Sequence, residues 1–183
     1  MARKRKESQN KKINPTFFIF CEGETEVAYI NFLKSHYRLP TIQIHTRIKG
    51  NDISEKYIDS YKQDKPTHQK DKTFLLYDLD VTGMLAKLRG IANCTILVSN
   101  PCIEFWFLLH YKSHVSSIQC SICCREMKNR NNHYKKGIIN EKLKRKLESK
   151  MTHAVTKAKS LKEYNNPSST VYRLIEELNT LKK

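Results

Sequence analysis

Short runs of apolar residues alternate over the first 110 residues with segments whose apolar residues recur every third or fourth position. The apolar runs, which are typical of buried strands, lie at 17–21, 42–48, 73–77 and 94–98. The segments with helical spacing, or with apolar residues on all sides, lie at 25–37, 53–61, 84–91 and 103–111. This alternation predicts an α/β fold with a mostly parallel, four-stranded sheet that is flanked by helices.

The pattern beyond residue 112 predicts helices alone. Apolar residues recur every fourth position from Ile139 to Met151, and after the Asn166-Pro167 break a second apolar stripe runs from Val171 to Leu181. We interpret Ser168 and Ser169 as caps of the last helix, and Asn100 as the cap of the helix at 103–111. We therefore expect a helical C-terminal appendage, whose apolar stripe either packs on the sheet or docks a partner.

The chain length of 183 residues suits one domain with an appendage. We divide it into a basic arm at 1–14, interpreted as disordered, a Rossmann-like domain at 15–112, and a basic helical extension at 113–183 that packs on the domain. No apolar run approaches the ~18–20 residues that a membrane span needs. The basic N-terminus is not followed by an apolar stretch, so a signal peptide is not expected and we predict a cytoplasmic protein.

Charge is the strongest compositional signal. The chain has 34 Lys and Arg against 18 Asp and Glu, a net charge of +16, which favours a polyanionic partner such as DNA or RNA, although the charge could serve solubility alone. Residues 125–150 hold ten bases and three acids. The candidate nucleic-acid-binding residues, unless they form only a solvated helix face, are Lys135, Lys136, Lys142, Lys144, Arg145 and Lys146.

Two acidic clusters interrupt this basic chain. Lys and Arg are absent from residues 13–33 and 73–86, where Glu22 ends the first expected strand and Asp78 and Asp80 end the third. In a parallel sheet the carboxyl ends of the strands share one edge, so these carboxylates are expected to meet there.

Crowded carboxylates repel one another unless a cation lies between them, and Mg²⁺ or Mn²⁺ with oxygen ligands is the natural solution. Glu26, one helical turn after Glu22, is expected to face the same edge. Such a metal activates water and stabilises a phosphodiester transition state, so the sequence predicts a metal-dependent nuclease. The alternative is that the acids only cap helices and turns, which we favour for Glu24.

Several motifs carry a family resemblance. F-C-E-G-E-T-E at 20–26 and L-Y-D-L-D-V-T-G at 76–83 resemble the two acidic motifs of the Toprim domain. S-N-P-C-I-E-F-W-F-L-L-H-Y at 99–111, together with Y-K-K at 134–136 and N-P-S-S-T-V-Y at 166–172, resembles the RloB-like family within that superfamily.

This resemblance, which covers about residues 16–181, implies a nuclease of prokaryotic anti-phage defence, of the abortive-infection kind, that is commonly encoded beside an ATPase. It implies that Glu22 is the catalytic glutamate, that Asp78 and Asp80 are metal ligands, and that Glu26 matches a second ligand position. Related nucleases of the overcoming-lysogenization-defect type use a downstream lysine as a base. The sequence does not locate that lysine, so the number of metal ions stays open.

Three further residues are expected at the same edge of the sheet. Ser99, Asn100 and Glu104 follow or end the fourth strand and could reach the metal or position substrate, unless they only cap and fill the core. Separately, Cys120-x-x-Cys123-Cys124 resembles half of a zinc site. Because the sequence shows only one such pair, zinc binding is left open.

Two rival functions remain from the sequence. One is a small Toprim nuclease that processes structured RNA, and the other is a non-catalytic module that binds nucleic acid through a structural ion. No G-x-x-x-x-G-K-[ST] motif occurs, so any dependence on ATP is expected to come from a partner.

Overall fold

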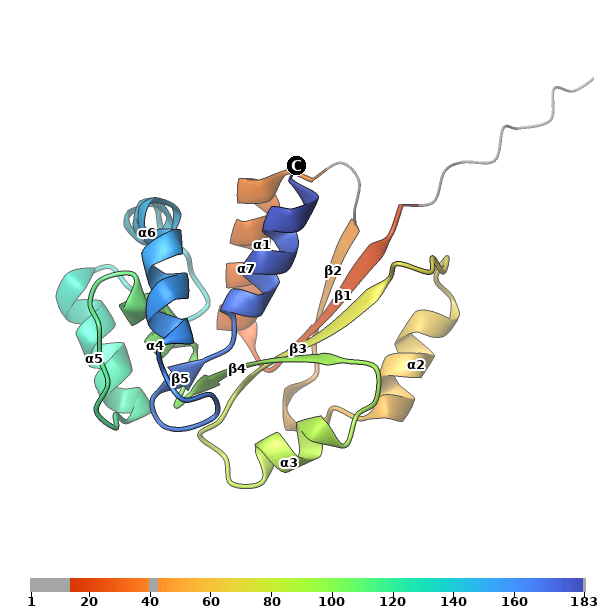
Figure 1. The fold of residues 1–183 in the computed structure, drawn as a ribbon, viewed down its shortest axis with the longest axis horizontal. Coiled ribbons are helices and arrows are strands. Elements are labelled where there is room, and N and C mark those ends of the chain that lie inside the picture. Colours follow the sequence, from red (N-terminus) through yellow and green to blue (C-terminus); the bar gives the residue numbers. More distant parts are fainter. Residues whose placement is uncertain (1–13, 40–42, 183) are drawn as a thin grey trace, which may run out of the picture.

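The computed structural model describes residues 14–39 and 43–182 (Figure 1). The sheet comprises β1 (Thr16–Cys21), β2 (Gln43–Ile48), β3 (Lys72–Asp78), β4 (Thr95–Asn100) and β5 (Ser168–Ser169). The strand order is β2-β1-β3-β4-β5, with the first four strands parallel and β5 antiparallel to β4. The mostly parallel α/β fold is confirmed, but the sheet has five strands rather than four.

Helices connect these strands and fill both faces of the sheet. They are α1 (Glu24–Tyr37), α2 (Glu55–Gln63), α3 (Met84–Arg89), α4 (Ile103–Leu109), α5 (Cys120–Arg130), α6 (Glu141–Lys159) and α7 (Tyr172–Leu181), with a 3₁₀ turn at Gly50–Asp52. None of the helices in the described segments is long and apolar enough to cross a membrane. The expected basic arm, apart from Asn14, and Ile42 of the expected second strand lie outside the described residues.

The strands are apolar on both sides because both faces of the sheet are covered. Phe17, Ile19 and Cys21 of β1 pack in one cluster with α1, α4 and the C-terminal helices, whereas Phe18 and Phe20 pack in a second cluster with residues of α2 and α3. Figure 1 shows α1 and α7 on one face of the sheet and α2 and α3 on the other. Successive side chains of a strand point to opposite faces, and both faces are buried here. The apolar runs in the sequence are therefore continuous.

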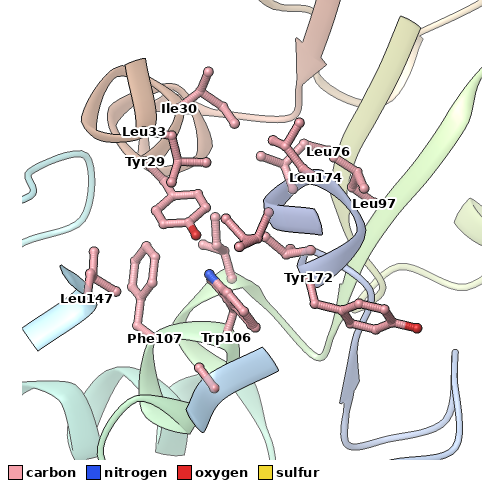
Figure 2. Packing of buried hydrophobic residues seen from close by; sticks show 14 of the residues in the cluster. Tyr29, Ile30, Leu33, Leu76, Leu97, Trp106, Phe107, Leu147, Tyr172 and Leu174 are labelled. Carbon is pink, nitrogen blue, oxygen red and sulfur yellow. The ribbon is translucent and has the colours of Figure 1, made fainter. Parts of the chain in front are cut away.

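The C-terminal segments belong to the main core. Figure 2 shows Leu174 of α7 and Leu147 of α6 in the same cluster as Tyr29 of α1 and Trp106 and Phe107 of α4. The ring centroids of Tyr29 and Phe107 are 5.5 Å apart. The apolar stripe of the last helix is therefore used inside the chain, which does not support the expectation that it docks a partner.

Two cap assignments were wrong. Ser168 and Ser169 do not cap the last helix; they pair with Asn100 and Ser99 as β5, and α7 begins only at Tyr172. This short strand attaches the C-terminal segment to the sheet edge, so the appendage is not purely helical.

Asn100 likewise remains in β4, and the residue that caps α4 is Cys102. The Asn100 side-chain amide instead donates to the Tyr164 carbonyl over 3.0 Å. The helix α5 was not expected either, because its buried face consists mainly of cysteine and methionine, which give little apolar periodicity.

Candidate metal centre and nucleic-acid interface

A cleft of about 350 Å³ opens at the carboxyl edge of the sheet, where β1 and β3 end side by side. Its lining contains Glu22, Glu26, Asp78 and Asp80, the four acids that the sequence placed at this edge. The remaining lining residues are Gly23, Glu24, Thr25, Ile103, Glu104, Lys136 and Gly137. The expected convergence of the carboxylates is thus present, and their catalytic and metal-binding roles stay predictions.

Strand pairing fixes two of these acids against each other. Glu22 follows the last residue of β1, and its backbone N–H continues the ladder by donating to the Leu76 carbonyl of β3 over 3.1 Å. Its carboxylate Oε2 accepts the Asp78 backbone N–H over 2.8 Å. The Glu22 side chain is therefore held across the end of β3, next to the Asp78 carboxylate.

Glu26 reaches the cleft from the first turn of α1. Its Oε2 accepts the Gly23 backbone N–H over 2.9 Å, in a capping-box arrangement at the start of the helix. Although it is almost fully buried, the side chain lines the cleft. Glu26 therefore both caps α1 and belongs to the acidic cluster.

The carboxylates shift one another's pKa upward. Burial raises the pKa of Asp78 well above its ordinary value, and the charges of Glu26 and Glu22 add to this. Burial also raises the pKa values of Glu22 and Glu26. Backbone hydrogen bonds to these carboxylates reduce the upward shift, and the charges of neighbouring carboxylates increase it. Such a cluster is costly to keep charged without a cation.

One oxygen in this cluster has no partner. Asp78 Oδ1 is buried and accepts no hydrogen bond from the described residues. Buried polar atoms are normally satisfied, so an orphaned carboxylate oxygen among neighbouring carboxylates is compatible with a bound cation. An all-oxygen donor set of this kind fits Mg²⁺ or Mn²⁺.

The sequence analysis missed that Lys136 belongs to this cleft. Lys136 lies on the loop before α6, and the next residue, Gly137, has a φ of +76°. The Gly137 N–H donates to Thr25 Oγ1 over 3.0 Å, and a Cβ at Gly137 would lie 3.3 Å from Glu24 Oε2. Glycine thus lets the loop approach α1 closely, which brings Lys136 to the acids as the only base in the part of the lining that the structure describes. The Y-K-K motif was the available signal, but the charge pattern had assigned it to nucleic-acid binding.

Glu104 links that loop to the wall of the cleft. Its side chain is only 1% exposed, and its Oε1 accepts the Tyr134 hydroxyl over 2.7 Å and lies 3.7 Å from Lys136 Nζ. Partial burial alone would lower the pKa of Lys136, but Glu104 and neighbouring thiols outweigh this and raise it. Lys136 is therefore a protonated base at the edge of the cleft.

The other two residues expected to support the site have different partners. Ser99 is buried, and its hydroxyl lies 3.0 Å from that of Ser169. Asn100 bonds to the Tyr164 carbonyl, as described above. Neither residue is among those that line the cleft, so of the three only Glu104 is brought to the acids.

A second, basic hollow of about 640 Å³ lies along α6. Lys142, Arg145 and Lys146 line it with Tyr111, and Lys146 Nζ lies 4.9 Å from the centroid of the Tyr111 ring. Lys144 instead pairs with Glu141 over 3.8 Å, and Lys135 lies on the loop that carries Lys136. An aromatic ring among cations suits a nucleic-acid backbone with a stacked base. The aromatic residue that the sequence places beside these bases is Tyr134, which is buried and donates to Glu104 instead.

Comparison with known proteins supplies a family. The sequence model of the family described as RloB-like protein matches residues 17–178. No curated protein sequence matched the chain. Among solved structures, the C-terminal region of the Burkholderia pseudomallei OLD protein is similar, with 15% sequence identity, a TM-score of 0.36, and coverage of 91% of this chain and 98% of that one. That structural similarity is too low to support an argument about function.

Proposed function

The chain belongs to the RloB-like family, and from this premise we propose that it is a divalent-metal-dependent nuclease that hydrolyses phosphodiester bonds in DNA or RNA. The observation that carries the proposal is the cleft in which four carboxylates converge at the ends of β1 and β3, with Asp78 Oδ1 buried and unpaired. Such a donor set needs a cation, and the surrounding chain is strongly basic.

The acids differ in how firmly the structure holds their side chains. Glu22 and Glu26 are each held by a backbone N–H, whereas Asp80 is exposed and free to adjust. These three residues and Asp78 would hold the metal. A bound Mg²⁺ would supply Lewis-acid stabilisation of the charge that develops on the phosphate.

Lys136 adds the positive charge that the chain itself provides. Because its pKa is raised, its ammonium group stays protonated at neutral pH and can bind a phosphate oxygen that enters the cleft. The loop that carries it is fixed to α1 through Gly137 and Thr25, so the charge is held ready. Lys136 is also our candidate for the downstream lysine that the family resemblance implies, but as a protonated group it would stabilise the charge on the phosphate rather than act as a base.

The basic hollow on α6 provides a path for the substrate. Lys142, Arg145 and Lys146 would contact phosphates, and Tyr111 offers a ring on which a base can stack. Lys135 and Lys144 would add to the long-range attraction. These contacts position a strand without reading its sequence.

The finer parts of the proposal rest on the motifs rather than on geometry. They are a Toprim-type architecture, a role as the effector of a cytoplasmic anti-phage defence system, and regulation by an ATPase that is encoded nearby. The chain contains no P-loop motif, so ATP would act through that partner.

The decisive experiment is a cleavage panel of the purified protein on plasmid, single-stranded DNA and tRNA, in Mg²⁺, Mn²⁺ or EDTA, with and without the neighbouring gene product. We expect cleavage in either metal and none in EDTA. Cleavage confined to one structured RNA would favour the RNA-processing alternative. Binding without cleavage under every condition would favour the non-catalytic alternative.

A further inference from the structure

Cysteines that are distant in sequence gather beside Glu104, at the start of two neighbouring helices. Cys102 caps α4, whereas Cys120 begins α5 and Cys124 follows one turn later on the same face of that helix. The sequence alone shows only the pair within α5. The fold supplies the missing thiol from the loop after β4.

The ligand atoms of this cluster are close enough to share an ion. The sulfur atoms of Cys102 and Cys120 and a carboxylate oxygen of Glu104 lie within 4.8 Å of one another. Cys124 lies one helical turn after Cys120, on the same face of α5, and its thiol is near enough to both of these thiols to interact with them electrostatically. At a zinc–sulfur distance of about 2.3 Å, a tetrahedral site separates its sulfur atoms by about 3.8 Å, so ligand atoms within 4.8 Å of one another need only small shifts to bind one ion.

Glu104 has one oxygen that its known contacts do not use. Oε1 receives the Tyr134 hydroxyl and pairs with Lys136, but Oε2 is buried and has no hydrogen-bond partner among the described residues. An unpaired oxygen of a fully buried carboxylate beside three thiols is the same signature as Asp78 Oδ1 in the cleft. Here, however, the neighbouring donors are sulfur rather than oxygen.

We propose that Cys102, Cys120, Cys124 and Glu104 form a zinc site that joins the start of α4 to the start of α5. Three thiolates and one carboxylate give the closed four-coordinate set of a structural zinc site, and soft thiolates select zinc over magnesium. All of these cysteines are free thiols, so their sulfur atoms are available to bind a metal ion. Lys136, beside the cluster, balances part of its negative charge.

The remaining nearby donors are less suited. On α5, Cys123 is completely buried in the main core, whereas Cys120 and Cys124 are partly exposed on a shared face, and His114 and His133 do not belong to the cluster. The site would also fix Glu104, which holds Tyr134 and Lys136 at the cleft. Glu104 would therefore be a ligand in the zinc site and a positioning residue for Tyr134 and Lys136 at the cleft.

Zinc content of the purified protein tests the proposal directly. We expect one zinc per chain in the wild type, and less than about a tenth of that in Cys120→Ser and Cys124→Ser. Cys94→Ser, which replaces a free thiol on the opposite face of the sheet, should keep its zinc. Asp80→Asn should keep it too, because that acid belongs to the cleft.

Measurements on the wild type alone keep the proposal testable if a cysteine variant fails to fold. A zinc chelator that is strong enough to compete with the protein's thiolates should lower the melting temperature. Zinc, but not magnesium, should then raise it again by about 5–10 °C when free zinc exceeds Kd about 100-fold. Cobalt added in place of zinc should give thiolate-to-metal charge-transfer absorption.

Three results would overturn the assignment. They are a wild type that neither retains nor rebinds zinc, equal zinc in wild type and Cys120→Ser, or a mass lower by two hydrogens that shows a disulfide within the cluster. Loss of zinc in Cys123→Ala with full retention in Glu104→Gln would overturn Glu104 as the fourth ligand.

Discussion

The acidic cleft and the thiol cluster meet at Glu104, in the first turn of α4, and they differ in their ligand atoms. The cleft gathers carboxylates, is open to solvent at Asp80, and carries the repulsion of like charges. The thiol cluster gathers sulfur, is largely enclosed, and joins two helices. We therefore propose an exchangeable hard metal in the cleft and a retained structural zinc in the thiol cluster.

Removing one charge from the cleft is the sharpest way to separate the two sites. Asp80→Asn or Glu22→Gln changes little in shape but removes a metal ligand, so we expect cleavage to fall roughly 1000-fold or more, from the loss of about 4 kcal/mol of transition-state stabilisation. Single-turnover cleavage of the substrate identified by the panel measures this effect.

The matched control is Asp59→Asn, an exposed acid on α2 away from the cleft, which should cleave at the wild-type rate. If Asp80→Asn also cleaved at that rate, the shared metal site would be wrong and the non-catalytic alternative would be preferred. Loss of zinc from Asp80→Asn would show that the two sites are not separate.

Lys136 is the second test, because it touches both regions. Among the described residues that line the cleft, Lys136 is the only base. We expect Lys136→Ala to slow cleavage by roughly 100-fold, as for loss of one oriented stabilising group. Lys136→Arg keeps the charge and should recover part of the rate. Equal rates for Lys136→Ala and the wild type at saturating substrate would contradict a role in the chemical step.

The sequence predicted the acidic cleft because the end of a buried strand can be recognised where an apolar run stops. Glu22 and Asp78 directly follow or end apolar runs, and parallel strands bring their carboxyl ends to one edge, so convergence needed no knowledge of packing. The order of β1 beside β3 is the one fact that the argument had to assume, and the structure confirms it.

The missed features depend on contacts between distant segments. Lys136 reaches the cleft only because Gly137 lets its loop approach α1, and Cys102 meets Cys120 only because α4 and α5 pack together. Neither contact leaves a periodic trace in the sequence. The two-residue strand β5 was likewise hidden, since two serines before a helix look like caps.

The basic hollow gives a third, smaller effect that should leave both metal sites intact. Alanine at Lys142, Arg145 and Lys146 removes up to three phosphate contacts, so we expect affinity for nucleic acid to fall about 10-fold. The slope of log affinity against log salt should flatten by roughly 0.7–0.9 per lost contact.

Fluorescence anisotropy over a range of salt concentrations measures this slope. The charge-matched control replaces Lys56, Lys65 and Lys70, on α2 and the loop after it, and should keep the slope close to that of the wild type. A slope unchanged by the α6 replacements would place the phosphate contacts elsewhere.

The smallest expected effect is a pH dependence confined to the cleft. Burial and neighbouring acids raise the pKa of Asp78, so the folded state holds its proton more tightly than the unfolded state, whose pKa is about 4. Without metal, this residue therefore favours folding least at pH values above its folded-state pKa, and stability is lost as pH rises from about 4 through that pKa.

Asp78→Asn removes the titration, and should melt about 2–5 °C above the metal-free wild type at pH 8, with the difference shrinking toward pH 4. Mg²⁺ competes with that proton, so its stabilisation of the wild type should grow with pH, while Asp78→Asn should respond much less. Differential scanning fluorimetry in EDTA and in Mg²⁺ measures both trends, with Asp59→Asn as the reference. A melting difference that stays constant from pH 4 to pH 8 would mean that the carboxylates do not share one crowded site.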